Sequence, residues 1–191
     1  MKIGLFFGSF NPIHVGHLII ANYMIEFTDL DKIWFVVSPQ NPFKLHDNLL
    51  PEKHRLNMVQ LAIQNNPYFE VSDIEFTLAK PSFTIHTLEA LNKNYPVSDF
   101  TLVMGSDNLA DLHKWKGYEE IINNYRLFVY YRNGFENQSL SVHPNVRVFE
   151  APVLNISATF IRDVLQKRKS VKYLLTTEVE EYMWKHCVSK L

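Results

Sequence analysis

Short apolar runs divide the chain at regular intervals. Four of them are nearly continuous, at residues 3–7, 33–37, 100–104 and 127–131. They are rich in β-branched and aromatic residues, and glycine or polar residues follow them, which is typical of strands buried on both faces of a sheet. A shorter and more polar run at residues 146–149 predicts a further strand at a sheet edge.

Helical stretches lie between and after these runs, at about residues 15–27, 51–64, 84–94, 118–123, 158–167 and 177–186. The alternation of strand and helix predicts an α/β fold with a Rossmann-like, doubly wound, mostly parallel sheet. We expect one domain over residues 1–191, in which about residues 155–191 form a small helical C-terminal subdomain. Ligands of such sheets bind beyond the carboxyl ends of the strands, where the strand order reverses. The ends of the runs at 3–7 and 100–104 should therefore flank the site.

Composition narrows the class of protein. The chain has 191 residues, 47% of them apolar, which suits one domain with a substantial core. A formal net charge of −1 argues against a long nucleic acid as partner. Cys187 is the only cysteine, which excludes an intrachain disulfide and a cysteine-based zinc cluster. No apolar run approaches the roughly 18 residues of a membrane span, and the N-terminus is a poor signal peptide. We therefore expect a cytoplasmic protein with no membrane partner.

The segment after the first apolar run carries candidate phosphate-binding chemistry. It reads Gly8-Ser9-Phe10-Asn11-Pro12-Ile13-His14-Val15-Gly16-His17. Gly8 permits a sharp turn and a close approach to a ligand, and Gly16 leaves room beside the histidines. His14 and His17 are three residues apart and share one face at a helix start. Helix N-terminal N–H groups and two imidazoles suit an anion such as a triphosphate. A zinc site is the rival interpretation, but this pair supplies only two ligands.

A second segment near the C-terminus has similar chemistry. It reads Ile156-Ser157-Ala158-Thr159-Phe160-Ile161-Arg162. Ser157 fits a helix N-cap, and Thr159 and Arg162 share a face one turn later. Hydroxyls, free N–H groups and a guanidinium form an anion site, because the planar guanidinium binds two phosphate oxygens at once. Taken alone, the segment also fits an ordinary capped amphipathic helix.

Together the two segments resemble the signatures of the nucleotidyltransferase superfamily, which includes class I aminoacyl-tRNA synthetases. The resemblance implies that His14 and His17 bind ATP phosphates and stabilise the charge that builds at the α-phosphate. It implies that the segment ending at Arg162 grips the β and γ phosphates. The synthetases have a K-M-S-K-S loop in this role and a tRNA-binding domain. This chain lacks the loop and has no room for the domain.

Four further segments resemble the bacterial nicotinate-nucleotide adenylyltransferase family, at residues 38–44, 80–84, 104–107 and 112–115. The resemblance implies adenylyl transfer from ATP to nicotinate mononucleotide, giving deamido-NAD and pyrophosphate, with Mg²⁺ bound through the ATP phosphates and no protein metal site. The implied catalytic residues are His14, His17, Lys44 and Arg162. The implied ATP-binding residues are Gly8, Ser9, Phe10, His14, Gly16, His17, Gly105, Asp107, Ile156, Ser157, Thr159 and Arg162. The implied mononucleotide-binding residues are Ser9, Phe10, Asn11, Lys44, Ser82, Phe83, Thr84 and Trp115.

Several of these residues have a second interpretation. Lys44 also fits a solvated loop lysine, and Asp107 fits either a ribose acceptor or a helix N-cap. Trp115 fits stacking on a pyridine ring or core packing. Residues 82–84 also fit a simple helix start. The chain departs from the family at Phe43, where histidine is common, and at His86, where aspartate is common.

Two other functions remain open from the sequence. The first is adenylyl transfer to nicotinamide mononucleotide or to phosphopantetheine, because the acceptor pocket decides between these substrates. The second is a non-catalytic nucleotide sensor, which would bind ATP without releasing pyrophosphate. The sequence carries no signal for the oligomeric state.

Overall fold

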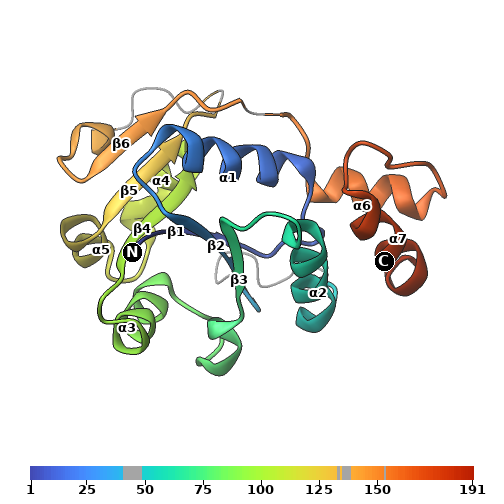
Figure 1. Ribbon diagram of the computed structural model, residues 1–191, viewed down its shortest axis with the longest axis horizontal. Helices are drawn as coiled ribbons and strands as arrows, with labels where there is room; N and C mark the ends of the chain where they lie inside the picture. Colours follow the sequence, from blue (N-terminus) through green and yellow to red (C-terminus); the bar gives the residue numbers. More distant parts are fainter. Residues whose placement is uncertain (41–48, 133, 135–138, 153) are drawn as a thin grey trace.

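Six strands form the centre of the molecule, in the order β3-β2-β1-β4-β5-β6 (Figure 1). The computed structural model describes residues 1–40, 49–132, 134, 139–152 and 154–191. The strands are β1 (Lys2–Gly8), β2 (Lys32–Val37), β3 (Phe69–Ser72), β4 (Asp99–Gly105), β5 (Arg126–Tyr130) and β6 (Val146–Phe149). Each neighbouring pair is parallel. This strand order is that of a Rossmann fold, so the predicted doubly wound α/β fold is confirmed, with a fully parallel sheet.

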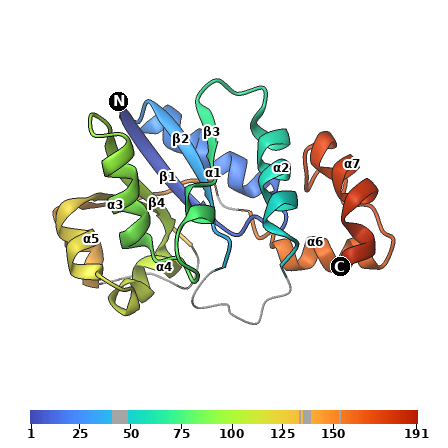
Figure 2. The same ribbon diagram turned by 90° about the horizontal axis from the view of Figure 1, so that it is seen from below.

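Helices cover both faces of this sheet (Figure 2). They are α1 (Val15–Phe27), α2 (Glu52–Ile63), α3 (Thr84–Asn94), α4 (Ser106–Asp111), α5 (Tyr118–Asn124), α6 (Ala158–Gln166) and α7 (Thr177–His186). One buried cluster joins the sheet to α1, α2, α6 and α7, and a second joins it to α3, α4 and α5. The short 3₁₀ helices are η1 (Ile74–Thr77), η2 (Leu112–Lys114), η3 (Ser139–Val142) and η4 (Val188–Lys190).

Neighbouring residues along each central strand enter opposite cores. In β1, Phe6 belongs to the cluster on the α1 face, and Leu5 belongs to the cluster on the α3 face. Because side chains alternate along a strand, a strand covered on both faces is apolar at nearly every position. This requirement explains the continuous apolar runs. Two elements were missed: β3, whose residues are mixed in polarity, and the short helix α4.

The strand order reverses at β1. The chain runs outward from β1 through β2 to β3, and then returns to β4 on the other side of β1. At a reversal point, the connections that follow the two neighbouring strands run in opposite directions. Neither connection covers the carboxyl ends of these strands, so a crevice remains there. The predicted edge position of β6 is confirmed, since β6 pairs only with β5. Among the described helices, none combines the length and apolar character of a membrane span.

Candidate active site

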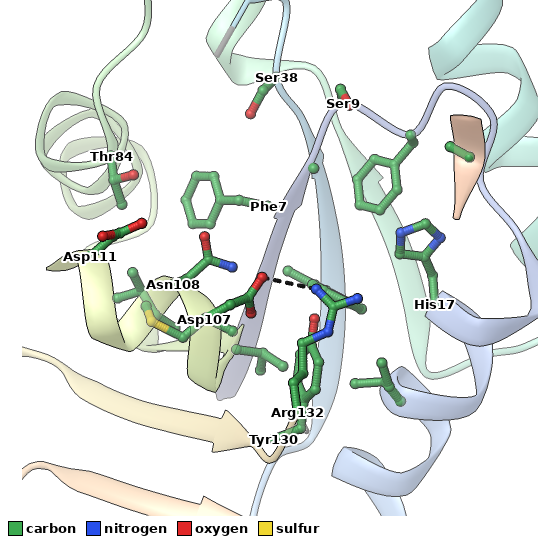
Figure 3. Close-up of a pocket in the computed structure, with 18 of the residues that line it drawn as sticks. Phe7, Ser9, His17, Ser38, Thr84, Asp107, Asn108, Asp111, Tyr130 and Arg132 are labelled. Carbon is green, nitrogen blue, oxygen red and sulfur yellow. Dashed lines mark hydrogen bonds and ion pairs between the residues drawn. The ribbon is translucent and has the colours of Figure 1, made fainter. Parts of the chain in front are cut away.

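A cleft of about 750 Å³ opens where the strand order reverses, at the carboxyl ends of β1 and β4. This volume lies within the range of about 300–1,000 Å³ that is common for small-molecule sites. In Figure 3, Thr84 and Asp111 stand on one wall of the cleft and His17 on the opposite wall, with Arg132 between them. The cleft therefore lies where the sequence predicted the site.

Most of the predicted site residues that the structure describes line this cleft. They are Gly8, Ser9, Phe10, Asn11, His14, Gly16, His17, Ser82, Phe83, Thr84, Asp107, Trp115, Ile156 and Ser157. Gly105, Thr159 and Arg162 are not among the lining residues. Lys44, and with it the family departure at Phe43, lies outside the described residues.

The turn after β1 is held in a strained conformation by aromatic packing. Phe10 has a φ of 45°, in the left-handed region that residues other than glycine rarely adopt. Its ring is 2% exposed and packs edge-on against His17 and Phe35, with centroid distances of 5.2 and 5.7 Å. A Cβ on Gly8 would lie 2.8 Å from this ring, so glycine is required there. Phe10 therefore supports the floor of the cleft, as strained residues at binding sites often do.

The two histidines at the start of α1 stack on each other, with ring centroids 3.7 Å apart. The backbone N–H of His14 donates to Nδ1 of His17 over 3.2 Å. Because Nδ1 of His17 accepts this bond, the neutral ring carries its proton on Nε2. Nδ1 of His14 is buried without a hydrogen-bond partner among the described residues. The pair can therefore present imidazole N–H donors to an anion at the helix N-terminus.

The pKa values of both histidines lie below 7, so both imidazoles are neutral at pH 7. Burial, and secondly the positive charge of Arg132, lower the pKa of His14 from 6.5 to about 4. Burial, then His14, then Arg132, lower the pKa of His17 well below 6.5. A nearby anion favours the charged form of an imidazole. A bound triphosphate should therefore raise both pKa values.

The second predicted motif meets the first at this turn. Ser157 caps α6, and its hydroxyl accepts from the backbone N–H of Phe160 over 3.1 Å. Arg162 donates from Nη1 to the backbone carbonyl of Asn11 over 2.7 Å and from Nη2 to the hydroxyl of Thr159 over 3.3 Å. The guanidinium thus lies beside the histidine-bearing turn, although the two segments are far apart in the sequence.

Asp107 is held by a partner that the sequence analysis did not identify. Its Oδ2 accepts from Nη1 of Arg132 over 2.9 Å (Figure 3). Its Oδ1 is buried without a hydrogen-bond partner among the described residues, so this oxygen remains for a ligand hydroxyl. The alternative interpretation of Asp107 as an N-cap is wrong, because Gly105 occupies that position. A Cβ on Gly105 would lie 2.2 Å from Oδ1 of Asp107, so Gly105 gives this carboxylate its space.

Arg132 is the main residue that sequence reasoning missed. It lines the cleft two residues after β5 and lowers the pKa of both histidines through its charge. The rule that pointed to the ends of β1 and β4 applies equally to β5. Applied to the polar residue after the fourth apolar run, that rule would have identified Arg132.

Glu75 is a buried carboxylate that lines the cleft and is only 2% exposed. Its Oε2 accepts from the hydroxyl of Ser82 over 2.6 Å, and its Oε1 accepts from the hydroxyl of Thr87 over 2.8 Å. Ser82 precedes α3 and Thr87 lies in its first turns. Both carboxylate oxygens therefore hold the start of α3 against η1. No sequence pattern indicates this role, because η1 has no regular apolar pattern.

Arg55 is a buried guanidinium in α2 that is only 1% exposed. Its nitrogens donate to the backbone carbonyls of Leu50, Ser9, Ser38 and Pro39, over 2.9, 2.7, 2.6 and 2.9 Å. Burial lowers its pKa to about 10, so it stays charged at neutral pH. One side chain thereby ties the chain beyond β1 and β2 to the start of α2. In the sequence it resembles any exposed helix arginine.

Aromatic residues complete the wall opposite the histidines. Trp115 lines the cleft and also packs against the core on the α3 face, so its core packing is confirmed and its stacking on a pyridine ring stays a prediction. Phe83 lines the cleft beside it. His86 is not a lining residue; its ring contacts the ring of Phe83 edge-on, with centroids 5.8 Å apart. His86, where the chain departs from the family, therefore contacts Phe83 and does not line the cleft.

Comparison with known proteins adds independent information. A family model described as cytidylyltransferase-like matches residues 5–164. A probable nicotinate-nucleotide adenylyltransferase of Cytophaga hutchinsonii is 56% identical over 181 residues, which cover 95% of this chain and 94% of that protein. One of Flavobacterium johnsoniae is 51% identical over 185 residues, which cover 96% of each chain. The solved Plasmodium falciparum nicotinic acid mononucleotide adenylyltransferase complexed with NaAD has a TM-score of 0.81 at 21% identity, covering 97% of this chain and 95% of that one. At that identity the structural likeness shows the fold alone.

Proposed function

This chain belongs to the cytidylyltransferase-like family and, within it, to the nicotinate-nucleotide adenylyltransferases, and from that premise we propose how its cleft transfers an adenylyl group. The substrates are ATP and nicotinate mononucleotide, and the products are deamido-NAD and pyrophosphate. One observation carries the proposal: Arg162 contacts the carbonyl of Asn11 over 2.7 Å. This contact brings the two motifs that we propose to bind phosphate together beside Asn11, which lines the cleft.

Each wall of the cleft binds one of the two substrates. The triphosphate of ATP lies at the N-terminus of α1, where His17 faces it, and Arg162 binds it from α6. The free oxygen of Asp107 accepts from a ribose hydroxyl of ATP. The mononucleotide lies against the opposite wall, with its pyridine ring on Phe83 and Trp115.

Catalysis in this arrangement depends on position and charge. An oxygen of the mononucleotide phosphate attacks the α-phosphorus of ATP, the bond to the β-phosphate oxygen breaks in line, and pyrophosphate leaves. No covalent enzyme intermediate is needed. Lys44 and Arg162 neutralise the negative charge that builds on the phosphate oxygens, and His14 and His17 donate hydrogen bonds to these oxygens. Ser157 and Thr159 assist as hydroxyl donors.

We propose that Mg²⁺ arrives with ATP, bound to its phosphates. Among the described residues there is no group of three or more His, Cys, Asp or Glu side chains that could hold a metal ion. Mg²⁺ commonly keeps waters and binds through substrate phosphates with few protein ligands. When bound, the ion supplies charge neutralisation on the triphosphate. We place the enzyme in the cytoplasm, where ATP and Mg²⁺ are available together.

Product identification tests this function. The purified protein is incubated with ATP, Mg²⁺ and nicotinate mononucleotide, and the products are identified by mass spectrometry while pyrophosphate is measured. We expect deamido-NAD and pyrophosphate in equal amounts. Parallel reactions with nicotinamide mononucleotide and with phosphopantetheine test the related acceptors. ATP binding without pyrophosphate release from any acceptor would identify a nucleotide sensor and contradict the proposal.

A further inference from the structure

A cationic side chain lies on the aromatic wall of the cleft. Lys116 lines the cleft directly after Trp115, and its Nζ lies over the ring of Phe83, 5.0 Å from the ring centroid. This wall includes Thr84 and Asp111, which stand opposite His17 in Figure 3. The ammonium is therefore beside the surface on which the pyridine ring is proposed to lie, and away from the phosphate-binding wall.

Among the described residues, the carboxylates that line the cleft are all engaged by other groups. They are Glu75, Asp107 and Asp111. Glu75 accepts from two hydroxyls, as described above. Asp107 pairs with Arg132 over 2.9 Å, and Asp111 pairs with Lys114 over 2.6 Å.

The other cations of the lining are thus paired, whereas Lys116 has no carboxylate partner among the described residues. An unpaired cation at the edge of a ligand cleft is suited to an anionic group of the ligand. The cation–π contact of an exposed lysine such as this one contributes only about 0.5–1 kcal/mol. It leaves the N–H donors of the ammonium available for a ligand.

We propose that Lys116 binds the carboxylate of the pyridine ring and thereby makes the enzyme prefer nicotinate mononucleotide to nicotinamide mononucleotide. This inference rests on the proposed function, because it assigns the acceptor ring to this wall. A ring that stacks on Phe83 and Trp115 brings its substituent to the ammonium that lies over the same surface. The nicotinate carboxylate gains a charge partner there, whereas the nicotinamide amide is neutral and gains much less.

The test compares both acceptors in one variant series. Replacing Lys116 by methionine keeps an unbranched side chain and removes the charge. In Lys116→Met we expect kcat/KM for nicotinate mononucleotide to fall about fivefold, the size of an exposed charge pair. The value for nicotinamide mononucleotide should stay within about twofold of the wild type, so the preference ratio falls. Lys116→Arg should restore the ratio.

Lys114→Met is the matched control. Lys114 also lines the cleft and is also exposed, but Asp111 binds its ammonium. This variant should leave the preference ratio unchanged. An unchanged ratio in Lys116→Met, or an equal loss with both acceptors, would overturn the specificity role while the adenylyltransferase assignment stands. A wild-type protein that converts neither mononucleotide would overturn both.

Discussion

His17 stands at the point where a neutral imidazole can donate one hydrogen bond to a transferring phosphate. Removing such a donor typically raises the barrier by about 3 kcal/mol. We expect His17→Ala to lower kcat roughly a hundredfold or more, with an unchanged far-UV circular dichroism spectrum. His113→Ala, at an exposed histidine of η2, is the control and should keep normal turnover. Near-normal turnover in His17→Ala would refute the assigned role.

The lowered pKa of His14 makes stability depend on pH. The folded state binds this proton only near pH 4, whereas the unfolded state binds it near 6.5. Between these values the unfolded state holds more protons, so the free energy of unfolding falls as the pH falls. From pH 7.5 to 5.0 we expect His14 to account for a loss of about 2 kcal/mol.

Urea unfolding at both pH values measures this dependence. His14→Asn lacks the titrating group, so its free energy of unfolding should fall less over the same interval. The carboxylates and the other histidines remain in both proteins, so the difference reports His14 together with its effect on the pKa of His17. Equal losses in wild type and variant would show that His14 titrates at its ordinary pKa in the folded protein.

Single residues differ in how well the sequence reveals them. His14, His17, Ser157 and Arg162 occur in dense motifs at the ends of predicted elements, and the structure brings both motifs together. Their roles in catalysis stay predictions, as does that of Lys44. Buried polar residues such as Glu75 and Arg55 have no such signal, because Glu75 binds ordinary hydroxyl side chains and Arg55 binds backbone carbonyls, which no sequence pattern marks.

At the scale of elements, Glu75 fastens the start of α3 to η1 and so shapes the acceptor wall. Glu75→Gln keeps the side-chain shape but makes one of the two atoms an N–H donor, so one hydroxyl bond must rearrange. We expect KM for nicotinate mononucleotide to rise about tenfold, equivalent to the roughly 1.4 kcal/mol of one net hydrogen bond, with KM for ATP within about twofold. Glu70→Gln, at a half-buried carboxylate of β3 that pairs with Lys32, should change neither value. A rise in both KM values would contradict a role limited to the acceptor wall.

Arg55 joins elements on the other side of the cleft. Arg55→Met would leave four backbone carbonyls without their donor. Each buried group without a partner costs about 1–3 kcal/mol. We expect the free energy of unfolding to fall by at least about 2 kcal/mol, since water can reach some of these carbonyls. Arg55→Lys keeps the charge but lacks the planar set of guanidinium donors, so its free energy of unfolding should lie between those of Arg55→Met and the wild type. A fully stable Arg55→Met protein in urea unfolding would contradict this role.

Elements with a clear apolar pattern were predicted well. The helices α1, α3 and α7 begin and end where the sequence placed them, and the strands of the sheet centre follow the apolar runs. The edge strand β3 and the short helix α4 were missed, because few of their residues must be apolar. The pairing of β1 with both β2 and β4 depends on long-range contacts, so the sequence supported it only through the rules for doubly wound sheets.

For the whole molecule, the reversal of strand order at β1 decides where chemistry occurs. It leaves a cleft above the ends of β1 and β4, and the chain places α6 beside that cleft after completing the sheet. The second phosphate motif thereby reaches the first. The division of residues 155–191 into a separate helical subdomain stays a prediction, although α6 and α7 share the core on the α1 face.

A crystal structure with a non-hydrolysable ATP analogue tests this account most directly, because the account depends on one cradle for the triphosphate. We predict phosphate oxygens within hydrogen-bond distance of Nε2 of His17 and of the Arg162 guanidinium, with the wall at Phe83 and Trp115 left free for the acceptor. A triphosphate that contacts only one of the two motifs, or that occupies the aromatic wall, would contradict it.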